Sequence, residues 1–351
     1  MAEQSHGRSA LPLRQGPATG TEARTVDVLT DIATRFYLGE ESQTRIARDL
    51  GLDPSTVSRY LKRAREVGIV HIEIRPPRRI DVDLGRAMAT RFGLARVIVA
   101  PTDPDVDASL GPVAAEYIEG LLRSGGRIGI SWGRTLESVI RHLRPGTVED
   151  VAVTQLAGGV DDPTPGIQGH DLVRRAAALF PGSRVQYLHA PAIVGTGNTR
   201  DVLLADRTVE TALDAARTSD LALVGIGAMD TASTMYRGGH VERADWTRLL
   251  DAGAVGNMNT RFFDASGAPI DLLDRRTIAI TWDELRAIPT VVAIAAGVAR
   301  VAAIRGALAT GAVDVLVTDQ ATAAAILRAD SGATRSRYDR DRRSTSEGRP
   351  A

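Results

Sequence analysis

The chain has 351 residues, about twice the length of an ordinary domain, so two domains or one domain with a large extension are expected. Its 43% hydrophobic and 25% charged residues are typical of globular proteins and exclude collagen-like, wholly disordered and membrane-embedded classes. Because the chain has no cysteine, it has no disulfide, no thiolate nucleophile and no Cys-ligated metal. The 43 Lys and Arg residues balance 43 Asp and Glu residues, so any affinity for nucleic acid has to be local.

The two ends of the chain lack an apolar face. Residues 1–23 and 331–351 are polar and without period, which predicts two disordered tails. The first fifteen residues have no apolar core of the kind found in a signal peptide. The longest nearly apolar stretch, 291–299, is shorter than the roughly 18 residues that cross a bilayer. These features predict a cytoplasmic protein with no membrane partner.

Two predicted helices open the folded part. Apolar residues recur at helical spacing from residue 25 to about residue 37. A second, short helix is predicted over residues 43–50, with Leu50 facing inward and Gly51 at the position that ends a helix in the left-handed conformation.

A third predicted helix begins at an N-cap. Asp53 is a favoured cap and Pro54 suits the first helical position, so a helix is expected from Pro54 to about Val67. A helix, a glycine-containing turn and a capped second helix form a helix-turn-helix motif, whose second helix enters the DNA major groove. At about 100° per residue, the inward face of this helix is Val57, Leu61 and Ala64.

The outward face of the third helix carries the predicted DNA contacts. Arg59 can pair bidentately with guanine, whereas Lys62 suits backbone phosphate. Between residues 45 and 79 there are nine Lys and Arg residues against four acids, so this region is basic although the whole chain is neutral. The alternative is a helical dimerisation cap with a solvated basic face. The full set of predicted DNA-binding residues is Gln43, Ser55, Thr56, Ser58, Arg59, Lys62 and Arg63.

The pattern of apolar residues changes after a proline-containing linker. Residues 69–74 alternate like a short strand and complete a DNA-binding domain over 24–75. Residues 76–80 are the predicted linker, and a second domain is predicted over 81–330. In this domain apolar strands alternate with amphipathic helices, which is typical of an α/β fold with a mostly parallel sheet covered on both faces. The predicted strands are 96–100, 127–131, 151–159, 184–188, 221–227, 277–281, 290–296 and 313–318.

The most informative segment of the second domain is a strand, a glycine turn and a helix start. Its residues are Ser131, Trp132, Gly133, Arg134 and Thr135. N–H groups at a helix N-terminus attract anions, and glycine permits close approach of a ligand. The alternative is a tight turn in which the glycine serves packing alone.

Polar residues at other predicted strand ends support a ligand site at the same sheet edge. Residues 264–267 are interpreted instead as a turn. The further predicted effector-binding residues are Gln155, Gly227, Asp230, Asn257, Asp283 and Arg300.

Taken together, these segments resemble the SorC/DeoR-type sugar-binding transcriptional regulators over about residues 25–329. The motifs that carry the resemblance include residues 55–59 (STVSR), GISWGRTL at 129–136, LVGIGAM at 223–229 and IRGALATGAVDVLVTD at 304–319. The resemblance implies a winged helix-turn-helix followed by an effector domain similar to the glucosamine-6-phosphate deaminase and ribose-5-phosphate isomerase folds. It also implies a homodimer or homotetramer on operator DNA, a sugar, polyol or sugar-phosphate effector, and no cofactor.

The chain departs from this family at two positions. Arg134 stands where many phosphosugar-binding relatives carry the first of two threonines, and Arg300 matches a common lysine. Both departures leave open whether the effector is phosphorylated; two arginines favour an anion, whereas Asp230 and Asp283 favour a neutral polyol. Lys62 is the only lysine, so a Schiff base in the second domain is excluded.

The rival function is a sugar-phosphate isomerase or deaminase with an appended helical domain. In such enzymes the glycine strand end leads into an Asp-Gly-His run, whereas here residues 225–232 are GIGAMDTA. His170, His189 and His240 are isolated in the sequence, and there is no HExxH or other metal-ligand spacing. A pure scaffold would leave the polar strand ends unexplained. We therefore expect a regulator with no catalytic residues and no metal site.

Overall fold

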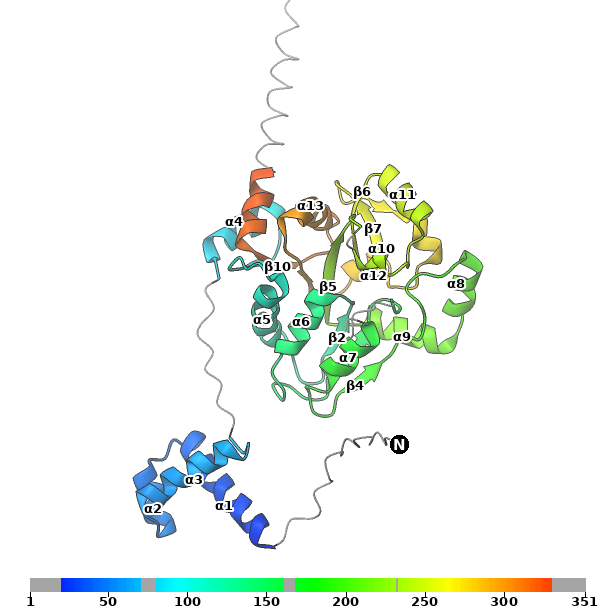
Figure 1. Cartoon of the computed structure of the whole chain (residues 1–351). Helices are drawn as coiled ribbons and strands as arrows, with labels where there is room; N and C mark the ends of the chain where they lie inside the picture. Colours follow the sequence, from blue (N-terminus) through cyan, green and yellow to red (C-terminus); the bar gives the residue numbers. More distant parts are fainter. Residues whose placement is uncertain (1–19, 71–79, 161–167, 232, 330–351) are drawn as a thin grey trace, which may run out of the picture. The chain divides into compact units, whose positions relative to one another are not determined.

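The computed structural model describes residues 20–70, 80–160, 168–231 and 233–329. The chain divides into two compact units, Met1–Pro77 and Arg78–Ala351. Most of the expected strand at 69–74 and of the linker at 76–80, and the tail at 331–351, lie outside the described residues. Figure 1 shows the two units with their helices and strands labelled.

The first unit consists of three helices around a small apolar core. They are α1 (Gly20–Tyr37), α2 (Gln43–Leu50) and α3 (Pro54–Glu66). As the pattern predicts, Gly51 ends α2 with φ 65° and Pro54 begins α3. The core is Leu29, Ile32, Ala33, Ile46, Ala47, Val57, Leu61 and Ala64, which includes the predicted inward face of α3.

Two expectations for this unit are wrong. Helix α1 begins at Gly20, earlier than residue 25, so the last residues of the expected disordered tail are helical. Leu50 does not face inward, because it is 39% exposed at the end of α2. Gly51 turns the chain immediately after it, and the apolar contact on this side is made by the partly buried Leu52 instead.

The second unit is built on seven parallel strands, as the alternation of strands and helices predicts. Their order is β1-β10-β9-β5-β2-β3-β4. In that order the bounds are Arg96–Ala100, Val315–Asp319, Val291–Ile294, Leu221–Ala228, Arg127–Ile130, Ala152–Gln155 and Arg184–Gln186.

Helices cover both faces of the sheet. Val97 and Val99 of β1 point into one apolar cluster, and Ile98 and Ala100 point into the other, so the strand is buried on both sides. One face carries α5 (Val106–Glu119), α6 (Arg134–His142) and α7 (Gly169–Ala177), which lie next to one another in Figure 1. The other carries α4 (Val82–Phe92), α9 (Arg207–Arg217), α13 (Val301–Ala309) and the helical residues 320–329.

An antiparallel extension, which the sequence reasoning missed, continues from the end of β5. Strand β5 pairs with β6 (Ala254–Met258), β6 with β7 (Arg261–Asp264), and β7 with β8 (Pro269–Ile270). Asn259 and Thr260 form the turn between β6 and β7 with φ 51° and 66°. Two left-handed residues in a two-residue turn match the twist of a hairpin. Gly227 pairs with Asn257, so this hairpin lies against the carboxyl end of β5.

The remaining elements surround the antiparallel extension. They are α8 (Gly197–Leu204), α10 (Thr234–Arg237), α11 (Arg243–Asp251), η1 (Asp271–Arg276), α12 (Trp282–Arg286) and η2 (Val298–Arg300). The described chain has no helix long and apolar enough to span a membrane.

The strand expected over 277–281 does not join the parallel sheet. It forms isolated antiparallel bridges, Ile193 with Thr277 and Ala157 with Ala279. The buried guanidinium of Arg261 donates to the carbonyls of Ala279 and Ile280 at 3.0 and 2.7 Å and pairs with Asp274. This arginine satisfies carbonyls that a sheet neighbour would otherwise pair, and thereby holds the segment against β7.

Candidate functional site

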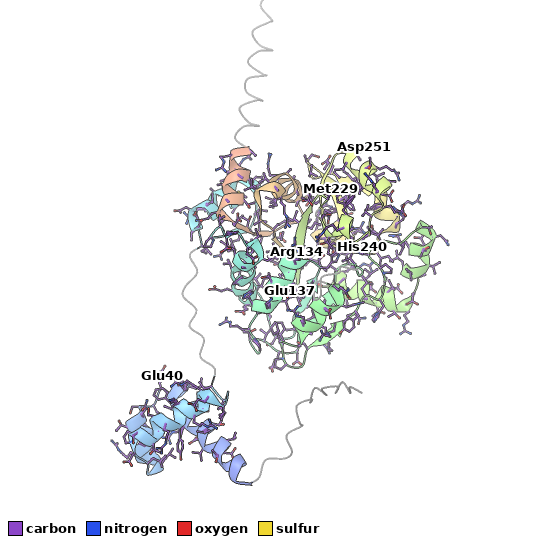
Figure 2. The ribbon with its side chains drawn as sticks, in the orientation of Figure 1. Glu40, Arg134, Glu137, Met229, His240 and Asp251 are labelled. Carbon is purple, nitrogen blue, oxygen red and sulfur yellow. The ribbon has the colours of Figure 1, made fainter. Side chains whose placement is uncertain are left out.

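The loop after β2 forms a helix N-terminus with glycine at the cap. Gly133 is the N-cap of α6 and has φ 135°, a conformation that side chains rarely adopt. The first intrahelical bond runs from Glu137 N–H to the Gly133 carbonyl (3.0 Å), so the N–H groups of residues 134–136 have no acceptor within the helix. Figure 2 labels Arg134 and Glu137 on this first turn. The predicted glycine turn and helix start are therefore present.

Helix α5 fixes the start of α6. The Thr135 hydroxyl donates to Asp107 Oδ1 at 2.8 Å, and the Ser138 hydroxyl donates to the Asp107 carbonyl at 2.6 Å. Gly111 of α5 lies so close to Ser138 that a Cβ on it would come within 2.1 Å of the hydroxyl oxygen. The two helices thus pack with their backbones in contact and hold the loop between β2 and α6 in one position.

The hairpin turn holds the same loop from the other side. Ser131 donates to Asn259 Oδ1 at 3.1 Å, and Asn259 Nδ2 donates to the Leu156 carbonyl at 3.2 Å. Ser131 and Asn259 are each 4% exposed. One asparagine therefore connects the ends of β2 and β3 through the turn between β6 and β7.

A cavity of about 140 Å³, partly open to solvent, lies where these segments meet. It lies beyond the carboxyl ends of β2, β5 and β9, which is the usual ligand position in parallel α/β sheets. Nine of the eleven predicted effector residues line it, namely Ser131, Trp132, Gly133, Arg134, Thr135, Gly227, Asp230, Asn257 and Arg300.

The cavity offers unused donors and charges to a ligand. Trp132 Nε1 and Asn257 Nδ2 are buried and have no hydrogen-bond partner among the described residues. Arg134 and Arg300 form no ion pair within the same part of the chain, whereas most other described arginines of the unit do. Buried donors without a partner are costly. A ligand with several oxygen atoms would satisfy them.

Two predicted effector residues lie outside the cavity lining. Gln155 is fully buried, and its Oε1 accepts from Leu188 N–H at 3.1 Å, so it supports the chain after β4. The side chain of Asp283 is 95% exposed on α12 and pairs with Arg286 at 2.8 Å. Both predictions are wrong because Gln155 is used to fill the interior and because residues 277–281 place α12 away from the carboxyl edge.

Several lining residues were missed. Asp107 lies in the first turn of α5, after the carboxyl end of β1, and the strand-end rule that found Asp230 would have found it. Asn259 required recognition of the hairpin, which the Asn-Thr turn and its flanking alternation indicate only weakly. Ser233 and Met235 come from the short α10 and its cap, which carry no strand-end signal. The expected turn at 264–267 is confirmed, since Asp264 Oδ1 accepts from Ser266 and Ala268 N–H.

The candidate DNA surface is the outward face of α3. Ser55, Ser58, Arg59, Lys62 and Arg63 are exposed there, and Gln43 and Thr56 are partly buried. Arg63 pairs with Glu66 at 3.3 Å, so its charge is partly satisfied. Among the described residues, Arg59 and Lys62 have no ion-pair partner. Arg59 and Lys62 therefore offer their charges on the helix face opposite the core.

The chain is similar to known proteins along most of its length. Residues 79–328 match the family described as "Putative sugar-binding domain". The Deoxyribonucleoside regulator of Bacillus subtilis (strain 168) is 30% identical over 304 residues, covering 85% of this chain and 96% of that protein. The Transcriptional regulator LsrR of Klebsiella pneumoniae is 30% identical over 309 residues, covering 86% and 93%. The crystal structure of the full-length Sorbitol Operon Regulator SorC from Klebsiella pneumoniae has a TM-score of 0.66 and 28% identity, covering 87% of this chain and 99% of that chain.

Proposed function

This chain belongs to the family of SorC/DeoR-type sugar-binding transcriptional regulators, and from that premise we propose how its two units divide the work. The protein is a DNA-binding transcriptional regulator controlled by a sugar-type effector. Its first unit binds operator DNA as a winged helix-turn-helix, with α3 in the major groove. Its second unit binds the effector in the cavity beside Trp132, in a fold of the deaminase and isomerase type.

The single observation that carries the effector site is the convergence of unsatisfied groups in one cavity. Trp132 Nε1, Asn257 Nδ2 and two guanidinium groups face space that the described residues leave unfilled. Ligand pockets characteristically combine a few convergent polar groups with apolar walls, here Ile226, Met235 and Ile294. The indole ring of Trp132 also provides a flat apolar surface for the face of a sugar.

We favour a phosphorylated sugar or polyol over a neutral one. The N-terminus of α6 attracts negative charge, and Arg134 on its first turn adds a planar fork suited to phosphate. The carboxylates of Asp107 and Asp230 also line the cavity, and they are suited to accept from sugar hydroxyls. The relatives' names support a sugar-related effector, since they include regulators of deoxyribonucleoside and sorbitol genes.

The second unit is proposed to be catalytically silent. No histidine lies among the cavity-lining residues of the described chain, and no group of three His, Asp or Glu in this part could hold a metal. His170 and His189 pack instead against Tyr187, with ring centroids 5.5 and 5.8 Å from it. The relatives are named transcriptional regulators. The protein is further proposed to act in the cytoplasm, as a homodimer or homotetramer on its operator.

A paired ligand screen tests this assignment. A hexose 6-phosphate and a pentose 5-phosphate are each compared with their unphosphorylated parents by thermal shift, because a ligand that binds only the folded state raises the melting temperature. Arg134→Ala is expected to lose the shift with the phosphates, and Arg207→Ala, an exposed arginine on α9 outside the cavity, is expected to keep it. Equal shifts with the neutral parents would replace the anion assignment by a polyol, and turnover of a bound phosphate seen by NMR would restore the enzyme reading.

A further inference from the structure

The linker enters the second unit at the same edge of the sheet as the effector cavity. Asp81, the N-cap of α4, donates its N–H to the Val99 carbonyl at 2.9 Å, near the carboxyl end of β1. The cavity lies beyond the carboxyl ends of β2, β5 and β9 in the same parallel sheet. In the strand order β1-β10-β9-β5, only β10 lies between β1, whose end bonds Asp81, and β9, which leads to η2. Contacts that connect Asp81 with η2 therefore have to cross only the carboxyl end of β10.

A buried threonine after β10 makes the first part of that connection. Arg300 lines the cavity from η2, and Gly297 is the N-cap of this short helix. Gly297 N–H donates to Thr322 Oγ1 at 2.8 Å, and Thr322 is fully buried. Thr322 N–H in turn donates to Asp319 Oδ1 at 2.7 Å, at the end of β10. The segment that carries Arg300 is thus tied by its cap to the turn that ends β10.

The same turn touches the base of the linker. Gln320 Nε2 donates to Asp81 Oδ2 at 3.2 Å, while Asp81 Oδ1 accepts from Leu84 N–H at 3.0 Å and caps α4. Next to it, Ala321 N–H donates to the hydroxyl of Thr102 at 2.9 Å. One carboxylate therefore holds the first turn of α4 with one oxygen and the turn after β10 with the other.

Resting on the proposed function, we propose that residues 319–322, the end of β10 and the first turn of the helix that follows it, transmit effector binding to the linker. When an anion engages Arg300, η2 and its cap adjust to it. Thr322 is fully buried, so breaking its bond to the Gly297 N–H would leave a buried polar group unsatisfied, and the hydroxyl therefore follows that donor. The movement reaches Asp81 through Gln320 and changes the stability of the first turn of α4, where the linker ends. Coupling between distant sites requires a segment whose arrangement both sites bias, and residues 319–322 contact both the cap of η2 and Asp81.

Hydrogen exchange of the intact protein tests the connection. The probes are the hexose 6-phosphate and the pentose 5-phosphate, and the readout is the exchange of the peptide 80–86, which contains the Leu84 and Gly85 amides bonded to Asp81. Thr322→Val removes the acceptor at nearly constant shape. Thr310→Val is the matched control, because Thr310 is also buried and its hydroxyl accepts from Ala312 N–H at 3.2 Å, but it follows α13 at the opposite end of β10.

We expect the sugar phosphate to raise the melting temperature of the wild type, Thr310→Val and Thr322→Val. Hydrogen exchange over residues 80–86 is expected to change with ligand in the wild type and Thr310→Val, but not in Thr322→Val. Gln320→Ala is expected to behave like Thr322→Val, and since Gln320 is exposed this variant keeps its fold if Thr322→Val does not. A ligand-induced change that persists in both variants would overturn the connection and leave the proposed effector site standing. A probe that shifts no melting temperature would overturn the phosphorylated effector, and with it the connection that rests on it.

Discussion

Ser131 and Asn259, which are 128 residues apart in sequence, share a buried hydrogen bond of 3.1 Å. Ser131 belongs to the loop between β2 and α6, and Asn259 to the left-handed turn between β6 and β7. The bond makes the hairpin a structural part of the proposed effector site. The position of Arg134 therefore depends on a segment that the alternation of parallel strands and helices gives no reason to expect.

Asn259 is predicted to be important through its side chain and its backbone separately. Asn259→Gly keeps the left-handed conformation but loses both side-chain bonds, so we expect a loss of about 1 to 3 kcal/mol in the free energy of unfolding. Asn259→Ala adds the cost of a positive φ and is expected to lose more. Asn259→Asp keeps the acceptor for Ser131 but loses the donor to Leu156. Urea titration measures all three; equal stability of the glycine variant and the wild type would contradict the bridging role.

Two glycines of β5 form a matched pair for testing the cavity. A Cβ on Gly227 would lie 2.6 Å from Asn257 Nδ2, whereas a Cβ on Gly225 would have only the Trp132 carbonyl within reach, at 4.0 Å. Gly227→Ala is therefore expected to displace the Asn257 side chain and weaken sugar-phosphate binding by tenfold or more, about 1.4 kcal/mol. Gly225 also lines the cavity, but an alanine there meets no protein atom closer than 4.0 Å, so Gly225→Ala is expected to lose less affinity than Gly227→Ala. Isothermal titration of both variants decides, and equal affinities would remove Asn257 from the effector site.

The outward face of α3 is predicted to separate base reading from phosphate binding. Arg59→Ala should cost about 1 to 3 kcal/mol on the preferred sequence and relax base preference, because a bidentate pair with guanine is lost. Lys62→Ala should weaken all sequences alike and reduce the salt dependence of binding. Arg86→Ala, an exposed arginine of α4 that pairs with Asp83, is the control for net charge. Fluorescence anisotropy at several salt concentrations makes the comparison. If the three variants bind alike, α3 is not the reading helix.

The ion pair of Arg127 and Asp220 predicts a small loss of stability in acid. The Arg127 guanidinium donates to Asp220 at 2.9 Å and holds the pKa of that carboxyl below its ordinary value of about 3.9. A depressed folded pKa contributes stability above the unfolded value, and this contribution is lost as the pH falls through the folded one. Both side chains are about half exposed, so we expect Asp220→Asn to cost at most about 1 kcal/mol at pH 7.

The measurement for this pair is the unfolding free energy of wild type and Asp220→Asn between pH 7 and pH 3. The difference is expected to be largest at neutral pH and to shrink in acid. Asp83→Asn, whose side chain is 95% exposed, controls for the change in net charge. A difference between wild type and Asp220→Asn that grows as the pH falls would contradict the sign of the shift.

Local sequence patterns were sufficient to predict the parallel sheet and α3. Runs such as residues 96–100 are apolar on both faces and are buried in the structure for that reason. Pro54 at the first helical position and the spacing of Val57, Leu61 and Ala64 are sufficient to predict α3 and its outward face, although the Asp53 side chain makes no capping hydrogen bond. The glycine turn at Gly133 could be predicted on the same ground, because it lies directly between a strand and a helix.

Long-range contacts determine the features that the sequence patterns predict wrongly. Residues 277–281 have the composition of a strand, yet the buried Arg261 captures their carbonyls and keeps them out of the parallel sheet. Gln155 follows the strand-end rule but is used to bind Leu188 N–H in the interior. Asp283 was placed at the carboxyl edge on the assumption that the preceding segment is a sheet strand. No local pattern contains the position of a distant side chain, so these errors could not be avoided from one sequence.

We propose above that a ligand in the cavity beside Trp132 controls DNA binding by the first unit. The most direct measurement is the affinity of the full chain for duplex DNA from upstream of its own gene, with and without a saturating sugar phosphate identified by thermal shift. We predict that the ligand changes this affinity by about fivefold or more in the wild type, and that Arg134→Ala binds the DNA normally but no longer responds. An affinity that is the same with and without bound ligand, or an undiminished response of Arg134→Ala, would contradict the account.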